Sequence, residues 1–236
     1  MFQKQVIAPT ATAIIVAAGS GTRMGKDSNK QFILIDDIPV LAHTLLKFHH
    51  AETIDNIIIV TKPDFILTVS DLVREFGISK VKHIIPGGNT RQVSVNCGLA
   101  YADSGSFVAI HDGARPFITV EKINELVLTA HKFGAAAPGV VPKDTVKEIR
   151  GNSTIEATID REKLRLIQTP QVFKANVLKT AFEKAALDSF VGTDDCSIAE
   201  HYGIEIKVID GDYTNIKVTT PEDLPVAEAI YRFLNK

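Results

Sequence analysis

Short apolar runs rich in β-branched residues alternate with longer amphipathic stretches along this chain. Four of the runs have the length and composition of buried strands: residues 12–18, 56–60, 82–85 and 106–112. The stretches that follow have the length and end signals of helices: residues 39–48, 63–77, 91–102 and 120–134. Strands that are joined by helices pair in parallel through right-handed crossovers. The sequence therefore predicts an α/β fold with a three-layer, Rossmann-like, mostly parallel sheet.

One segment interrupts this alternation between residues 142 and 165. Two partly alternating runs, 145–149 and 154–159, flank "RGNS", which favours a hairpin turn. An isolated two-stranded hairpin is marginally stable in water, so we expect this arm to pack against something, with a second subunit as one candidate. The α/β pattern then resumes with a strand at 204–210. At 236 residues the chain is expected to form a single domain, 1–236, with a protruding β-hairpin arm at about 142–165.

Charge and composition exclude several classes of protein. The formal net charge of -2 gives no general attraction to nucleic acid or to a membrane surface, so an anion site must be local. No stretch approaches the ~20 apolar residues that a membrane span needs. Cys97 and Cys196 are too few for a disulfide framework, and a cytoplasmic location is therefore the expectation.

A glycine-rich loop follows the first expected strand. Its sequence "GSGTRMG" fits neither the G-x-x-x-x-G-K-[ST] phosphate loop nor the G-x-G-x-x-G dinucleotide fingerprint. Glycines allow the backbone to approach a ligand closely, and successive N–H groups can bind phosphate. The glycines alone leave a plain strand-to-loop turn open as an alternative. Arg23 and Lys30 favour the phosphate interpretation, because two nearby cations suit a polyphosphate.

Other polar stretches stand at the ends of expected elements. Paired glycines in "PGGNTRQVSV" would admit a base edge, although a helix start capped by Asn89 or Thr90 is an alternative. Asp112 ends the fourth expected strand, where metal and substrate contacts gather in such sheets, but it could also cap a turn. Residues 164–173, 192–197 and 213–224, taken singly, are typical of caps and turns, with Thr193 as a candidate N-cap.

Together these stretches resemble one enzyme family. "AAGSGTRMG", "KQF", "HDGARPF", "QTPQVF", "GTDDCS" and "NIKVTTPEDL" are similar, in this order, to the 2-C-methyl-D-erythritol 4-phosphate cytidylyltransferases of non-mevalonate isoprenoid biosynthesis. The resemblance implies CTP and a polyol phosphate as substrates, Mg²⁺ as cofactor without assigned metal ligands, and a homodimer with shared active sites. A ribitol-5-phosphate cytidylyltransferase and a non-catalytic, nucleotide-binding regulatory protein are the alternatives.

The resemblance also implies roles for single residues. The catalytic residues would be Arg23, Lys30, Lys217 and Arg161. The nucleotide would be bound by Ala17, Ala18, Gly19, Gly21, Gly88, Asn89 and Ser94. The acceptor substrate would be bound by Asp112, Thr145, Arg161, Thr169 and Thr193.

Overall fold

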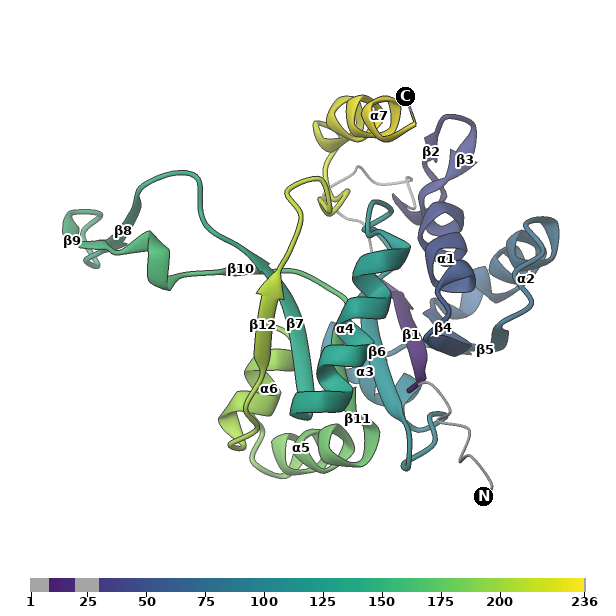
Figure 1. Ribbon diagram of the computed structural model, residues 1–236, viewed down its shortest axis with the longest axis horizontal. Coiled ribbons are helices and arrows are strands. Elements are labelled where there is room, and N and C mark those ends of the chain that lie inside the picture. The colour runs from purple at the N-terminus through teal and green to yellow at the C-terminus, as the bar shows by residue number, and fades with distance from the viewer. Residues whose placement is uncertain (1–8, 20–29, 236) are drawn as a thin grey trace, which may run out of the picture.

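A computed structural model of the chain describes residues 9–19 and 30–235 (Figure 1). Within these residues one eight-stranded sheet forms the centre of the protein. Its strands are β1 (Ala11–Ala17), β4 (Ile54–Thr61), β5 (Val81–Pro86), β6 (Phe107–Asp112), β7 (Ala135–Val140), β10 (Leu166–Ile167), β11 (Gln171–Lys174) and β12 (Lys207–Asp210). Their order is β10-β7-β11-β6-β1-β4-β5, and β12 pairs with β7.

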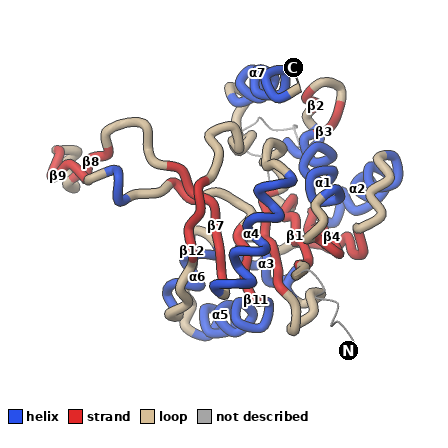
Figure 2. The backbone as a smooth tube through the Cα atoms, in the orientation of Figure 1, coloured by secondary structure: helices blue, strands red, loops and turns tan. Residues whose placement is uncertain are grey.

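Helices cover both faces of this sheet (Figure 2). The α-helices are α1 (Val40–His50), α2 (Ile66–Glu75), α3 (Arg91–Leu99), α4 (Val120–Phe133), α5 (Ala175–Leu187), α6 (Asp195–His201) and α7 (Asp223–Leu234). Short 3-10 turns are η2 (Lys30–Phe32), η3 (Pro63–Phe65) and η4 (Arg161–Lys163), and a small separate ribbon pairs β2 (Leu34–Ile35) with β3 (Ile38–Pro39). None of the helices in the described ranges has the length and apolar character needed to cross a bilayer.

The strands separate two hydrophobic cores because successive side chains point to opposite faces of a sheet. In β1, Ala13 and Ile15 pack in the core formed with α1, α2 and α4, whereas Ile14 packs in the core formed with α3, α5 and α6. All three side chains are fully buried. Burial on both faces explains why the central strands are continuous apolar runs rather than alternating ones. The predicted three-layer α/β fold is confirmed.

The sheet topology determines where a ligand can bind. Strand β1 pairs in parallel with β4 on one side and with β6 on the other, and β4 pairs in parallel with β5. The chain therefore builds outward from β1 to β5 and then returns to the far side of β1 at β6. The strand order reverses between β1 and β6, and in open α/β sheets ligands bind beyond the carboxyl ends of the strands at such a switch point. Strands β10 and β11 run antiparallel to their neighbours, so the sheet is mostly parallel, as predicted.

The predicted hairpin is confirmed as a two-stranded antiparallel ribbon of β8 (Val146–Ile149) and β9 (Ile155–Ile159). Figure 1 shows this arm projecting from the body of the protein, beyond the edge formed by β10 and β12. Ile149 and Ile155 are more than half exposed, at 54% and 58%. Apolar side chains on a projecting ribbon are what a contact with another chain would cover. A subunit partner for the arm remains a prediction.

Candidate active site

Two adjoining cavities lie at the carboxyl ends of the central strands. The first has a volume of about 530 Å³ and is lined mainly by the end of β1, the loop after β5 and the turn after β6. The second has a volume of about 510 Å³ and is lined mainly by the segment from the end of β10 to the start of β11 and by the start of α6. Arg91, Asp112 and Lys217 line both cavities. A ligand in one cavity would therefore meet a ligand in the other at these three side chains.

The first cavity contains the described part of the expected nucleotide site. Its lining includes all of the expected residues that the structure describes: Ala17, Ala18, Gly19, Gly88, Asn89 and Ser94. The loop between β5 and α3 is held in shape by Ser94, whose hydroxyl accepts from the Gly88 N–H at 3.1 Å and donates to the Thr90 carbonyl at 2.9 Å. A Cβ atom at Gly87 would lie 2.6 Å from the Ala18 Cβ, so this loop can approach β1 only with glycine there.

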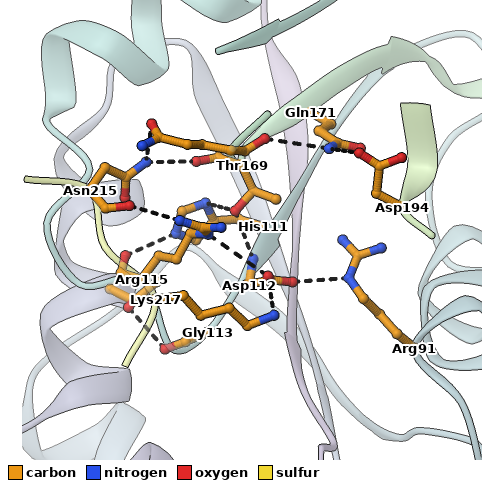
Figure 3. A network of polar contacts seen from close by, with 12 residues as sticks. Arg91, His111, Asp112, Gly113, Arg115, Thr169, Gln171, Asp194, Asn215 and Lys217 are labelled. Atoms are coloured by element: carbon orange, nitrogen blue, oxygen red, sulfur yellow. Dashed lines mark hydrogen bonds and ion pairs between the residues drawn. The ribbon is translucent and has the colours of Figure 1, made fainter. Parts of the chain in front are cut away.

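Asp112 is the charged centre of the junction between the cavities (Figure 3). Its Oδ2 lies 2.6 Å from the Lys217 Nζ and 3.9 Å from the Arg115 Nε, while its Oδ1 lies 3.0 Å from the Arg91 Nε. Burial by itself would raise the pKa of Asp112, but Arg91 and Lys217 outweigh it and hold the pKa well below its usual range. Asp112 is therefore a permanent carboxylate that orients cations.

Thr169 stands on the wall of the second cavity, held by His111 and Asp112. The Asp112 N–H donates to the Thr169 Oγ1 at 3.2 Å, and this oxygen lies 2.9 Å from the His111 Nδ1. The His111 Nε2 lies 3.1 Å from the Arg115 carbonyl, which can only accept, so Nε2 carries the proton and Nδ1 accepts from the Thr169 hydroxyl. Burial lowers the pKa of His111 to about 4, which keeps the ring neutral.

The N-terminus of α6 forms the opposite wall of the second cavity, and Thr193 lies just before it. Its N-cap is Asp194, whose carboxylate accepts from the Ser197 N–H at 2.7 Å, so the candidate cap at Thr193 was wrong. The Gln171 amide ties this cap to β11, donating to Asp194 at 2.8 Å (Figure 3) and accepting from the Cys196 N–H at 2.9 Å. Burial raises the pKa of the Cys196 thiol, so it cannot act as a thiolate nucleophile.

Two expected substrate residues lie on the projecting arm instead of in the cavities. Thr145 and Arg161 are exposed, and neither lines the cavities of this chain. The Arg161 guanidinium donates to the Lys143 carbonyl at 2.6 Å. Arg23 and Gly21 fall outside the described residues, and of Lys30 only the backbone, which begins η2, is described.

Three residues of the site were not predicted from the sequence: Arg91, Arg115 and Asp195. Arg115 donates to the Asn215 carbonyl at 2.8 Å and fixes the segment that carries Lys217. Arg91 occupies the first position of α3, where a cation faces the positive end of the helix dipole and is disfavoured. An arginine at this position therefore indicates a specific acidic partner. This pattern could have identified Arg91 as a site residue from the sequence.

A mostly parallel sheet with a glycine-lined crevice at its switch point, opening onto a second cavity that contains Arg91, Arg115 and Lys217, defines a nucleotidyltransferase-type α/β protein. The chain matches the family model for IspD, 2-C-methyl-D-erythritol 4-phosphate cytidylyltransferase, over residues 11–233, and it belongs to that family.

Curated relatives and solved structures agree with the family match. The chain is 45% identical to the 2-C-methyl-D-erythritol 4-phosphate cytidylyltransferase of Clostridium novyi (strain NT), over 92% of this chain and 95% of that protein. It is 40% identical to that of Syntrophus aciditrophicus (strain SB), over 95% and 97%. The 4-diphosphocytidyl-2C-methyl-D-erythritol synthase structure from Anaerococcus prevotii DSM 20548 is similar with a TM-score of 0.85 and 32% identity, over 97% of each chain.

Proposed function

We propose that this protein transfers the cytidylyl group of CTP to 2-C-methyl-D-erythritol 4-phosphate, a step of isoprenoid biosynthesis. The observation that carries the proposal is the junction at Asp112, where a glycine-lined cavity and a second, strongly polar cavity share Arg91 and Lys217. The first cavity would bind CTP and the second the polyol phosphate. Their reacting phosphates would then meet beside Lys217. Family membership supports this assignment over a ribitol phosphate acceptor or a non-catalytic role.

The reaction needs positioning and charge more than proton transfer. An oxygen of the acceptor phosphate attacks the α-phosphorus of CTP, a new P–O bond forms, and the bond to pyrophosphate breaks. The nucleophile is already an anion, so no general base is required, and the neutral His111 and the inert Cys196 thiol are not needed as bases. Arg23, Lys30 and Lys217 would stabilise the negative charge that develops on the transferred phosphoryl group.

Each cavity would recognise its substrate with the residues that line it. The backbone at Ala17, Ala18 and Gly19, with Gly21, would surround the CTP phosphates and ribose. The loop that carries Gly88, Asn89 and Ser94 would contact the cytosine. Asp112, Thr169 and Thr193 would hold the acceptor, and Thr169 enters with its hydroxyl already oriented by His111. This preorganisation supports the acceptor assignment, because an oriented hydroxyl loses less freedom when the substrate binds.

The arm would complete the acceptor site of a second subunit. Thr145 and Arg161 are exposed on the arm and absent from the lining of both cavities of this chain, yet they belong to the expected acceptor site. A two-fold axis would place each arm on an equivalent surface of the partner and bury Ile149 and Ile155. We accordingly treat residues 1–236 as one nucleotidyltransferase domain whose segment 142–165 is a dimerisation arm. The guanidinium of Arg161 suits bidentate binding of a phosphate monoester.

Divalent cation binding fits the chemistry of the first cavity. Asp112 is the one carboxylate among its described lining residues, and no group of three or more acidic, histidine or cysteine side chains in the described ranges could form a metal cage. A Mg²⁺ ion held mainly by triphosphate oxygens and water, near Asp112, needs no such cage. When bound, it would offset charge on the leaving pyrophosphate. The location of the protein is proposed as cytoplasmic, which the free thiols of Cys97 and Cys196 support.

Pyrophosphate release tests the proposal directly. The purified protein is incubated with CTP and Mg²⁺ and either 2-C-methyl-D-erythritol 4-phosphate or ribitol 5-phosphate. We expect release with the first acceptor and little with the second, and loss of release when EDTA removes the metal. Release that requires ribitol 5-phosphate would establish the alternative acceptor. No release with either acceptor would refute a cytidylyltransferase function.

Mixing two inactive variants tests the shared active site. If Arg161 acts on the partner's site, a mixed dimer of Arg161→Ala and Lys30→Ala subunits has one site with both lesions and one intact site. We therefore expect each variant alone to be impaired and the mixture to recover activity after subunit exchange. If Arg161 served its own subunit, every site would carry one lesion and mixing would restore nothing.

A further inference from the structure

An ion cluster joins three distant parts of the chain between the two cavities. It consists of Arg91, the first residue of α3, Asp112, the last residue of β6, and Asp195, the first residue of α6. The Arg91 Nη1 and Nη2 donate to the two Asp195 carboxylate oxygens at 3.1 and 2.7 Å, and its Nε donates to Asp112 at 3.0 Å. Figure 3 shows Arg91 approaching Asp112 from the side opposite to Lys217. One guanidinium thus connects the nucleotide loop, the sheet and the acceptor wall.

The two oxygens of Asp112 have different partners. Oδ1 accepts from Arg91, whereas Oδ2 contacts the Lys217 Nζ at 2.6 Å. The Asp112 carboxylate could rotate about its own bond if only one oxygen were held. Because Arg91 fixes Oδ1, Oδ2 stays directed at Lys217. The rotation of this carboxylate therefore sets the position of the Lys217 ammonium group, together with Arg115, which anchors the segment that carries Lys217.

The Arg91 side chain is itself anchored at its far end. Asp195 is fully buried, and both its oxygens accept from Arg91. Burial raises the pKa of Asp195, and the guanidinium opposes that effect. Because Nε, Nη1 and Nη2 are all bonded to carboxylates, the Arg91 side chain is held in one conformation and links Asp112 to Asp195. Because its guanidinium is already bonded to two carboxylates, Arg91 is not available to bind a mobile phosphate ligand.

We propose that Arg91 is a positioning residue for the transfer reaction: anchored on Asp195, it holds Asp112 in the rotation that places Lys217 at the reacting phosphates. This inference rests on the proposed role of Lys217 in the transfer. Arg91 acts through Asp112 and Lys217, so its loss reduces turnover without a matching loss of CTP binding. Groups that orient the ligands of a metal site typically contribute a factor of about 10 to 100, and we expect an effect of the same order from Arg91.

The first experiment compares Arg91→Gln with a variant that also removes the buried charge. Arg91→Gln alone leaves Asp195 buried and unpaired, which by itself destabilises a protein. The double variant Arg91→Gln, Asp195→Asn removes that charge, and thermal unfolding checks that it folds. We expect its kcat to stay about 10- to 100-fold below wild type with the KM for CTP little changed. Full recovery of kcat in the double variant would show that Arg91 only neutralises Asp195, and would overturn the inference.

The second experiment asks whether Arg91 acts through Lys217. In a Lys217→Met background, Arg91→Gln is expected to lower kcat little further, because the group it positions is already absent. Multiplicative losses would overturn the inference and leave the proposed function standing. Wild-type turnover in Lys217→Met alone would contradict the role of Lys217 and this inference together. Arg74→Gln is the matched control, since Arg74 is exposed and pairs only with the exposed Asp71 among the described residues; it should leave kcat unchanged.

Discussion

The buried imidazole of His111 links protein stability to pH. Its side chain is fully buried, and burial lowers its pKa from 6.5 to about 4. Between these values the unfolded chain binds a proton that the folded protein does not, so the free energy of unfolding falls as the pH falls. The drop in pKa corresponds to about 3 kcal/mol in full, of which about 2 kcal/mol is lost between pH ~7.5 and pH ~5. Below the folded-state pKa both states are protonated and the loss ends.

Urea unfolding of the wild type and of His111→Gln at these two pH values measures the effect. The variant loses stability at neutral pH for packing reasons, so the informative quantity is how the difference between the two proteins changes with pH. Other groups, including the buried His43, titrate in both proteins and cancel in this comparison. We expect the wild type to lose about 2 kcal/mol more than the variant on acidification. Parallel losses in the two proteins would refute a neutral, buried His111.

Three further predictions concern the nucleotide. Arg23→Ala and Lys30→Ala should each lower kcat by about 10²–10³ with a smaller effect on CTP affinity, measured by steady-state kinetics and equilibrium binding, because each removes a transition-state contact. CTP should be strongly preferred over UTP in pyrophosphate release, since backbone carbonyls near the paired glycines would accept from the cytosine amine and be left unpaired by uracil; equal rates would contradict this. Gly87→Ala should raise the KM for CTP, because its Cβ would lie 2.6 Å from the Ala18 Cβ; an unchanged KM would exclude a tight loop at this position.

The sequence predicted the central strands, the helices between them and the hairpin arm, but it missed several elements of the second half of the sheet. Strands β1, β4, β5 and β6 are recognisable because burial on both faces demands continuous apolar runs. Strand β7, with the sequence "AAAPGV", is just as buried, yet alanine, proline and glycine carry little strand propensity. Its conformation comes from pairing with β10, β11 and β12. Helices α5 and α6 were also not predicted, and α6 has only seven residues, too few to show a helical period.

The residues of the candidate site also fall into two groups, those that local sequence motifs reveal and those that they do not. Residues on glycine loops and at strand ends could be found from local motifs, and Ala17, Gly88 and Asp112 all line the cavities. The Arg91–Asp195 pair spans 104 residues, and no local pattern reveals a contact of that kind. Thr145 and Arg161 mark a second limit. The fold of one chain does not bring them to its own cavities, so their proposed roles depend on an assembly.

The charges at the junction of the cavities explain why the cluster cannot catalyse the reaction alone. Arg91, Arg115 and Lys217 carry three positive charges in this cluster, and Asp112 and Asp195 carry two negative ones, while the carboxylates of Asp194 and Glu200 also line the second cavity. Little net positive charge is therefore left to meet two phosphate groups that repel each other as they approach. Ion pairs already formed in the folded protein give accurate orientation, because their geometry does not need to be assembled when substrates arrive. The paired charges, however, largely neutralise one another. Under the proposed function the described cluster would therefore orient the phosphates, and further cations, for which Arg23 and Lys30 are the candidates, would neutralise them.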